Sequence, residues 1–256
     1  MNVKILTIPK QEHRVWALLG HLQTVGFPVR KRDKVSVYRG FDYRDYDSNK
    51  HFCEEVLHRL GVKEELFPRR KRWNDLHSIA LAMECGIYLI LKEVVKEGEP
   101  CIFLENDAYF KKVWKPDMDY SRVYDALLDE WETLKQAVGY KNIKMVQLFY
   151  YIAREREPVT DFFVKGVHSA GQVGMIFTPH GAEWVLENKP LMPQIELYMD
   201  FHSNMGGLYG VKDSVITHEF YSNFDADERF LLGVGHHDPH EWFNHYRGQD
   251  LLRKVG

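Results

Sequence analysis

The sequence has few cysteines, no excess of basic residues and no long apolar run. Its three cysteines, Cys53, Cys85 and Cys101, are odd in number and show no Cys-x-x-Cys spacing, which favours a reducing compartment. A formal net charge of −3 excludes a globally basic nucleic-acid binder. No stretch approaches the roughly 18 apolar residues of a membrane span, and no signal-like segment opens the chain. We therefore expect no membrane span and a cytoplasmic location.

The length and composition suit a globular α/β domain. A chain of 256 residues with 45% apolar content can bury a full core. Helical spacing of apolar residues alternates with short apolar runs, which is typical of an α/β sandwich around a mostly parallel sheet. We expect one domain over residues 1–215 and a histidine-rich extension over 216–256, too short to fold alone. The predicted helices are 14–25, 51–60, about 75–96, 120–138 and 181–187, and the predicted strands include 3–8, 35–42, 144–150, 163–169 and 172–178.

One further strand begins at Pro100 and ends in acidic residues. It reads Pro100-Cys101-Ile102-Phe103-Leu104-Glu105-Asn106-Asp107, a continuous apolar run of the kind found in buried parallel strands. Ligands of open α/β sheets bind outside the carboxyl ends of such strands. Carboxylates there could hold Mg²⁺ or Mn²⁺ against a diphosphate, and they could equally be ordinary turn formers.

The acidic segment Leu104-Glu105-Asn106-Asp107 resembles the Glu-Asp-Asp form of the DxD motif in glycosyltransferase family 25, the lipooligosaccharide and collagen galactosyltransferase type. Three other segments resemble the family in the same order. They are the opening strand 3–8 leading through Arg14 into a helix, the strand 35–42, and the stretch from Gly171 to Asp200. Two departures are plain: Asn106 stands at the family's central acidic position, and its Gly-Cys-x-x-Ser-His motif has no clean counterpart around residues 80–86.

The resemblance implies a GT-A-like fold with a Rossmann-like three-layer sandwich. It also implies a metal-dependent hexosyltransferase that uses a nucleotide-sugar donor, a UDP-sugar, with Mn²⁺ or Mg²⁺ as cofactor and a glycan as acceptor. We expect no membrane anchor before the domain and therefore a cytoplasmic bacterial or viral enzyme. Asp107 would ligate the metal directly, Glu105 would contact the ribose or a metal-bound water, and Asn106 would complete the nucleotide-sugar site.

Three other positions carry candidate roles. Asp200 matches the family's acidic position after a proline, and in an inverting transfer it would take the proton of the acceptor hydroxyl; it could equally be a helix N-cap. Arg14 could bind nucleotide phosphate through its fork of donors, or it could be an ordinary surface arginine. His236 and His237 lie in a polar tail where one imidazole could complete the Asp107 metal, although a simple polar loop also explains them.

Two alternative functions remain open. Two basic clusters, 30–34 and 69–72, would suit a phage-type enzyme that glycosylates hydroxymethylated DNA bases, because DNA phosphates attract Lys and Arg. Clusters this short are also common on solvated surfaces. In the other alternative, the neutral Asn106 reflects lost metal binding, and the chain is a catalytically silent sugar-binding module.

Overall fold

The structure is a computed structural model that describes residues 1–7, 11–31, 34–40, 58, 74–111, 114–115, 117–149, 153–168, 173–188 and 206–217. Its described helices are α1 (Glu12–Thr24), α3 (Asn74–Glu97), α4 (Val123–Val138) and α5 (Pro179–Asn188). The strands are β1 (Asn2–Thr7), β2 (Val35–Arg39), β3 (Cys101–Glu105), β4 (Tyr109–Phe110), β5 (Met145–Gln147), β6 (Ala153–Pro158), β7 (Phe163–His168), β8 (Gly174–Phe177), β9 (Leu208–Val211) and β10 (Ile216–Thr217).

The described strands form an eight-stranded sheet and a small second sheet. The order in the large sheet is β2-β1-β3-β8-β5-β9-β7-β6, and β4 pairs with β10 in the small one. In the large sheet β1 runs parallel to β2 and β3, and β5 runs parallel to β9, while the four remaining pairings are antiparallel. The expected α/β class is confirmed, but the expectation of a mostly parallel sheet is wrong in detail. The sheet is mixed because β8 and β7 each run against both of their neighbours.

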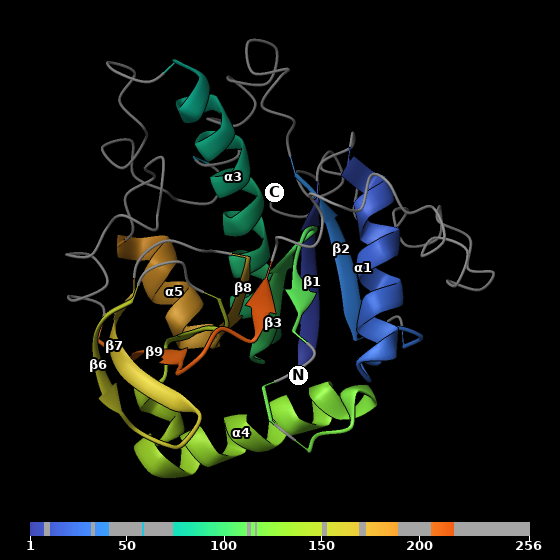
Figure 1. Cartoon of the computed structure of the whole chain (residues 1–256). Coiled ribbons are helices and arrows are strands. Elements are labelled where there is room, and N and C mark those ends of the chain that lie inside the picture. The colour runs from blue at the N-terminus through green and yellow to red at the C-terminus, as the bar shows by residue number, and fades with distance from the viewer. Residues whose placement is uncertain are drawn as a thin grey trace.

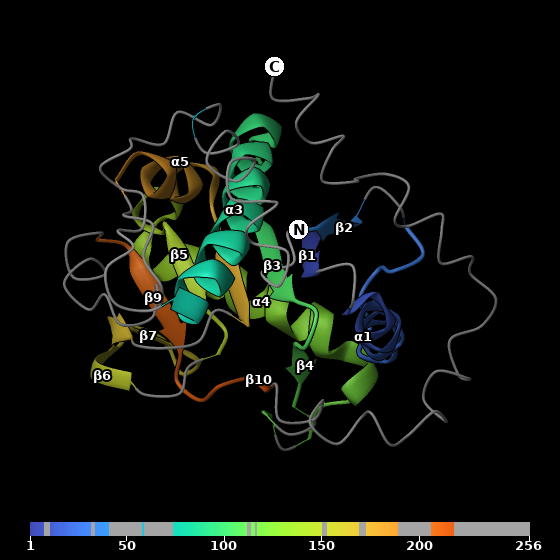
Figure 2. The same ribbon diagram turned by 90° about the horizontal axis from the view of Figure 1, so that it is seen from above.

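Helices cover both faces of the large sheet. Alternate strand residues such as Val3 and Ile102 belong to a core that includes Leu18 of α1 and Leu127 of α4. The intervening strand residues, such as Phe103, belong to a second core with α3 and α5. Figure 2 shows the resulting layers, with α3 and α5 on one side of the sheet and α1 and α4 on the other. This arrangement agrees with the α/β sandwich expected from the alternating pattern.

Several elements lie close to where the residue pattern predicts them. The helix expected over 14–25 is α1, the one expected over about 75–96 is α3, and the one expected over 120–138 is α4 after a 3₁₀ turn. Strands β5, β7 and β8 fall inside their predicted ranges. Strands β6 and β9 were not predicted. Of the helix expected over 51–60 the structure describes only residue 58, and of the extension 216–256 it describes only β10.

A buried ion cluster joins β1 to α3. Lys4 is only 2% exposed, and its Nζ donates to Glu97 Oε1 at 2.7 Å and to the Tyr38 hydroxyl at 2.9 Å. The Tyr38 hydroxyl in turn donates to Glu93 Oε2 at 2.7 Å. Burial raises the pKa of the neighbouring Cys101 thiol to about 12, so this cysteine is a packing residue rather than a nucleophile.

Among the residues that the structure describes, no helix is long and apolar enough to cross a membrane. Helix α4 has one apolar face, which includes Val123, Leu127, Trp131 and Leu134, and these residues belong to the core on that side of the sheet.

Candidate functional site at the carboxyl edge of the sheet

The strand order creates a topological switch point between β1 and β3. After β1 the chain passes through α1 to β2 on one side of β1, and it later returns through α3 to β3 on the other side. In open α/β sheets the crevice outside the carboxyl ends of two such strands is the usual ligand site. Figure 1 shows β1, β2 and β3 with their carboxyl ends at the top, away from α4. The acidic segment that follows β3 therefore lies at the edge where a ligand is expected.

The acidic segment forms a tight turn. The backbone N–H of Ala108 donates to the carbonyl oxygen of Glu105 at 3.1 Å, which places Asn106 and Asp107 at the two central positions of a β-turn. Glu105 and Asp107 are partly exposed, whereas Asn106 is only 7% exposed. The two carboxylates flank a buried amide.

Asn106 ties this turn to the first β-α unit. Its Nδ2 donates to Thr7 Oγ1 at 2.9 Å and to Gln11 Oε1 at 3.1 Å. Thr7 ends β1 and Gln11 precedes α1, so the amide bridges the switch point itself. A carboxylate has no proton to donate at neutral pH. Asn106 therefore has a structural role as a hydrogen-bond donor. An aspartate at this position could replace it only if the Thr7 and Gln11 side chains reoriented to donate to it.

A second anchor holds the chain just beyond the turn. The backbone N–H of Phe110 donates to His21 Nε2 at 2.9 Å, and the His21 ring stacks on Tyr109 with centroids 4.0 Å apart. The hydroxyl of Tyr120 donates to the Phe110 carbonyl at 2.8 Å. Burial lowers the pKa of His21 to about 3, so its imidazole is neutral and its Nε2 stays an acceptor at neutral pH.

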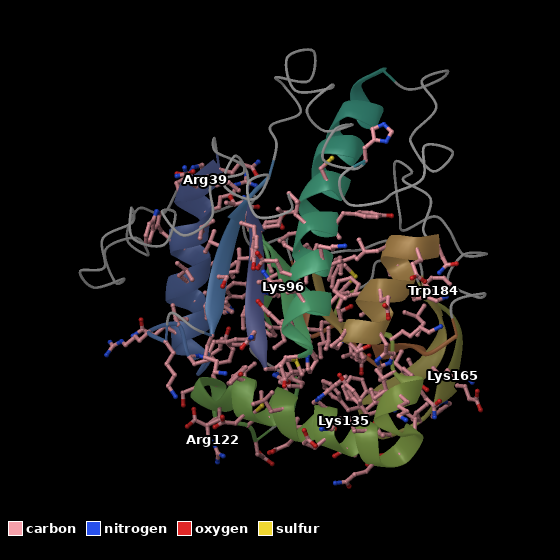
Figure 3. All side chains as sticks on the ribbon, turned by 180° about the vertical axis from the view of Figure 1, so that it is seen from behind. Arg39, Lys96, Arg122, Lys135, Lys165 and Trp184 are labelled. Atoms are coloured by element: carbon pink, nitrogen blue, oxygen red, sulfur yellow. The ribbon has the colours of Figure 1, made fainter. Side chains whose placement is uncertain are left out.

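The first turn of α1 brings an arginine to the same edge. Arg14 is partly exposed and lies in the first turn of the helix that follows β1, where helix N–H groups and a guanidinium both favour an anion. Next to it, Arg39 at the end of β2 forms an ion pair with Glu12. Figure 3 shows Arg39 at the end of the molecule opposite Lys135 of α4 and Arg122, which directly precedes that helix. The described edge therefore combines two carboxylates with nearby basic groups.

The described residues supply two carboxylates for a divalent cation. Within these ranges no group of three or more His, Cys, Asp and Glu side chains is placed to hold a metal. Mg²⁺ and Mn²⁺ do not need an all-protein cage, because such ions keep several waters and bind through one or two carboxylates plus substrate phosphates. Glu105 and Asp107 fit that partial ligand set.

Other predicted site residues lie outside the described part of the chain. These are Asp200, His236 and His237, and the basic cluster 69–72 lies outside it as well. Their predicted roles stay predictions. Two aromatic side chains that follow the turn pack within the protein: Tyr109 has one ring face against His21, and Trp114 packs on Phe162 with centroids 4.8 Å apart.

Sequence reasoning missed the residues that hold the acidic turn. Thr7, Gln11 and His21 each contact it from at least 85 positions away along the chain. His21 lies among the buried apolar residues of α1. A single histidine among core positions was the one feature of the sequence that could have indicated a buried hydrogen-bonding role. The partners of a buried polar side chain cannot be read from spacing.

No protein-family model matches this chain, and no curated protein matches it either.

Proposed function

We propose that the chain is a metal-dependent glycosyltransferase with a GT-A-like fold. It would transfer a hexose from a nucleotide-sugar donor, a UDP-sugar, to an acceptor hydroxyl on a glycan. The observation that carries this proposal is the Glu105–Asp107 turn, which is held at the topological switch point by the Asn106 bridge to Thr7 and Gln11. A diphosphate with its divalent cation is a ligand that suits two carboxylates at such an edge.

In this proposal Asp107 ligates the cation and Glu105 contacts the ribose or a metal-bound water. The bound Mn²⁺ or Mg²⁺ would supply positive charge for the departing diphosphate. The Asn106 bridge keeps the turn in place. A fixed position for the metal-binding carboxylates matters, because small displacements of catalytic groups lower the reaction rate steeply. Arg14, in the first turn of α1, would attract the nucleotide phosphates.

The acceptor side of the proposal rests on residues beyond the described ranges. Asp200 would remove the proton of the acceptor hydroxyl as that oxygen attacks the anomeric carbon, which makes the transfer inverting. His236 or His237 would add an imidazole ligand to the same cation. The Asp200 assignment comes from the resemblance to family 25, and the histidine assignment comes from the metal-binding chemistry of imidazole.

The decisive experiment measures UDP binding by calorimetry with and without Mn²⁺. The wild-type protein is expected to bind UDP in a Mn²⁺-dependent way, and Asp107→Asn is expected to remove that dependence because a neutral amide attracts a dication more weakly than a carboxylate does. Asp161→Asn, at an exposed position in the β6–β7 turn, is the matched control and should bind like wild type. The melting temperature of each variant is measured alongside.

Mn²⁺-dependent binding that survives Asp107→Asn would remove Asp107 from the metal site. Binding of UDP-sugar without any transfer or hydrolysis would favour the silent sugar-binding module instead.

A further inference from the structure

A second polar side chain is buried at the same edge of the sheet. Gln147 is the last residue of β5 and is 3% exposed. Its Oε1 makes no hydrogen bond to any residue in the described part of the chain. A buried amide oxygen without a partner carries a free-energy penalty, and most such groups in native proteins are satisfied by protein, water or ligand.

The immediate strand neighbours cannot satisfy this amide. Gln147 pairs with Met175 on β8 and with Gly210 on β9. Methionine offers only a thioether, which is no donor, and glycine has no side chain. Neither strand neighbour therefore donates a side-chain hydrogen bond to Oε1, and Gln147 lies toward the carboxyl edge of the sheet, where a ligand would lie.

Gln147 and Glu105 lie on the same face of the sheet. Met145, two residues before Gln147, and Phe103, two residues before Glu105, both belong to the core under α3 and α5. Side chains two residues apart on a strand share a face, so both polar groups face this side.

The strand register gives their separation. Phe103 and Gln147 both pair with Met175, so they are two strand spacings apart, and Glu105 lies two residues further along β3. With spacings of about 4.8 Å between strands and about 3.4 Å per residue, their Cα atoms are about 12 Å apart. This separation is of the order of the length of a nucleotide-sugar.

We propose that Gln147 binds a hydroxyl group of the hexose carried by the donor. This inference rests on the proposed function, which places the diphosphate and cation at Glu105 and Asp107. Phosphate oxygens accept hydrogen bonds and cannot satisfy Oε1, whereas a sugar hydroxyl donates to it. Gln147 is thus a specificity-determining residue for the transferred sugar, and the acidic turn holds the nucleotide end.

The test compares UDP, UDP-glucose and UDP-galactose binding, with Mn²⁺, in wild type and Gln147→Met. Methionine has a similar length and shape but no amide, and Gln136→Met, at an exposed position of α4, is the matched control. We expect Gln147→Met to bind UDP like wild type and to bind the preferred UDP-hexose about tenfold more weakly, since one buried hydrogen bond is lost. Its urea midpoint should stay close to that of wild type, because Oε1 has no hydrogen-bond partner in the described part of the chain.

Three results would overturn the proposal. Equal UDP-hexose affinity in Gln147→Met would show that the amide does not touch the sugar, and equal weakening of UDP would place the contact on the nucleotide. A lowered urea midpoint would reveal a partner within the protein. If wild type binds UDP and only the Gln147 comparison fails, the proposed function stands; if wild type binds none of the three, both proposals fall.

Discussion

The burial of the His21 imidazole leads to a quantitative prediction of how the free energy of unfolding depends on pH. His21 is 2% exposed, and burial lowers its pKa from the ordinary value near 6.5 to about 3. The unfolded chain therefore binds a proton between pH 6.5 and pH 3 that the folded protein refuses. The stability that this histidine contributes is fully present above pH 6.5 and is lost as the pH falls toward 3.

The size of the effect follows from the two protonation equilibria. At pH 5.0 the folded imidazole is still neutral, so the loss depends on the unfolded pKa alone. Relative to pH 7.5, the free energy of unfolding should fall by about 2 kcal/mol at pH 5.0 through His21, at about 1.4 kcal/mol per pH unit well below 6.5. Most unperturbed carboxylates remain ionised at pH 5.0, so this window favours histidine effects.

The assay is urea unfolding at pH 7.5 and pH 5.0 for wild type, His21→Gln and His13→Gln. His21→Gln will lower stability at both pH values because it removes the stacking on Tyr109, but the loss between the two pH values should shrink by about 2 kcal/mol. His13 is exposed on the same helix, and its glutamine variant should keep the wild-type pH dependence. If wild type and His21→Gln lose the same stability between pH 7.5 and pH 5.0, the folded protein does not hold His21 neutral, and the reasoning fails.

Two further stability predictions concern buried polar groups. Asn106→Ala should lower the free energy of unfolding by about 2 kcal/mol in urea titrations, because the hydrogen bonds to Thr7 and Gln11 are lost; Asn106→Asp should lose less, since the Thr7 hydroxyl can rotate to donate. An unchanged alanine variant would show that the bridge does not stabilise the fold. Lys4→Met should cost about 3 kcal/mol by leaving its partly buried partners Glu93 and Glu97 without their cation, and adding Glu93→Gln should recover part of this loss. A Lys4→Met protein as stable as wild type would contradict a structural role for the buried ammonium.

The residue pattern by itself determines the elements whose signal is local. Helix α4 follows the 3.6-residue spacing of its buried Val123, Leu127, Trp131 and Leu134, because one stripe of a helix must face the core. The apolar run from Cys101 to Leu104 similarly requires a strand buried on both faces. The acidic residues at the end of β3 could also be predicted from a local signal, because polar residues directly follow an apolar run.

Strands with weak local signals depended on their neighbours. The β6 sequence, Ala-Arg-Glu-Arg-Glu-Pro, has no apolar alternation, and its described pairing is with β7 alone. Strand β9 is four residues long and contains a glycine, yet it is fully buried because β5 and β7 flank it. Neither sequence has a strong strand propensity of its own. Both strands are stabilised by pairing with neighbouring strands of the sheet.

The candidate site shows the same division between sequence and tertiary structure. Sequence alone located Glu105 and Asp107, since an acidic end of a buried strand is a local feature. Only the folded chain shows that Asn106 bridges to Thr7 and Gln11, that His21 holds the segment beyond the turn, and that Gln147 lies on the same face as Glu105. These relations join residues far apart in the chain, and they exist because the strand order brings β1, β3 and β5 to one sheet. Hydrogen-bond partners across strands depend on that order, which no local pattern of residues specifies.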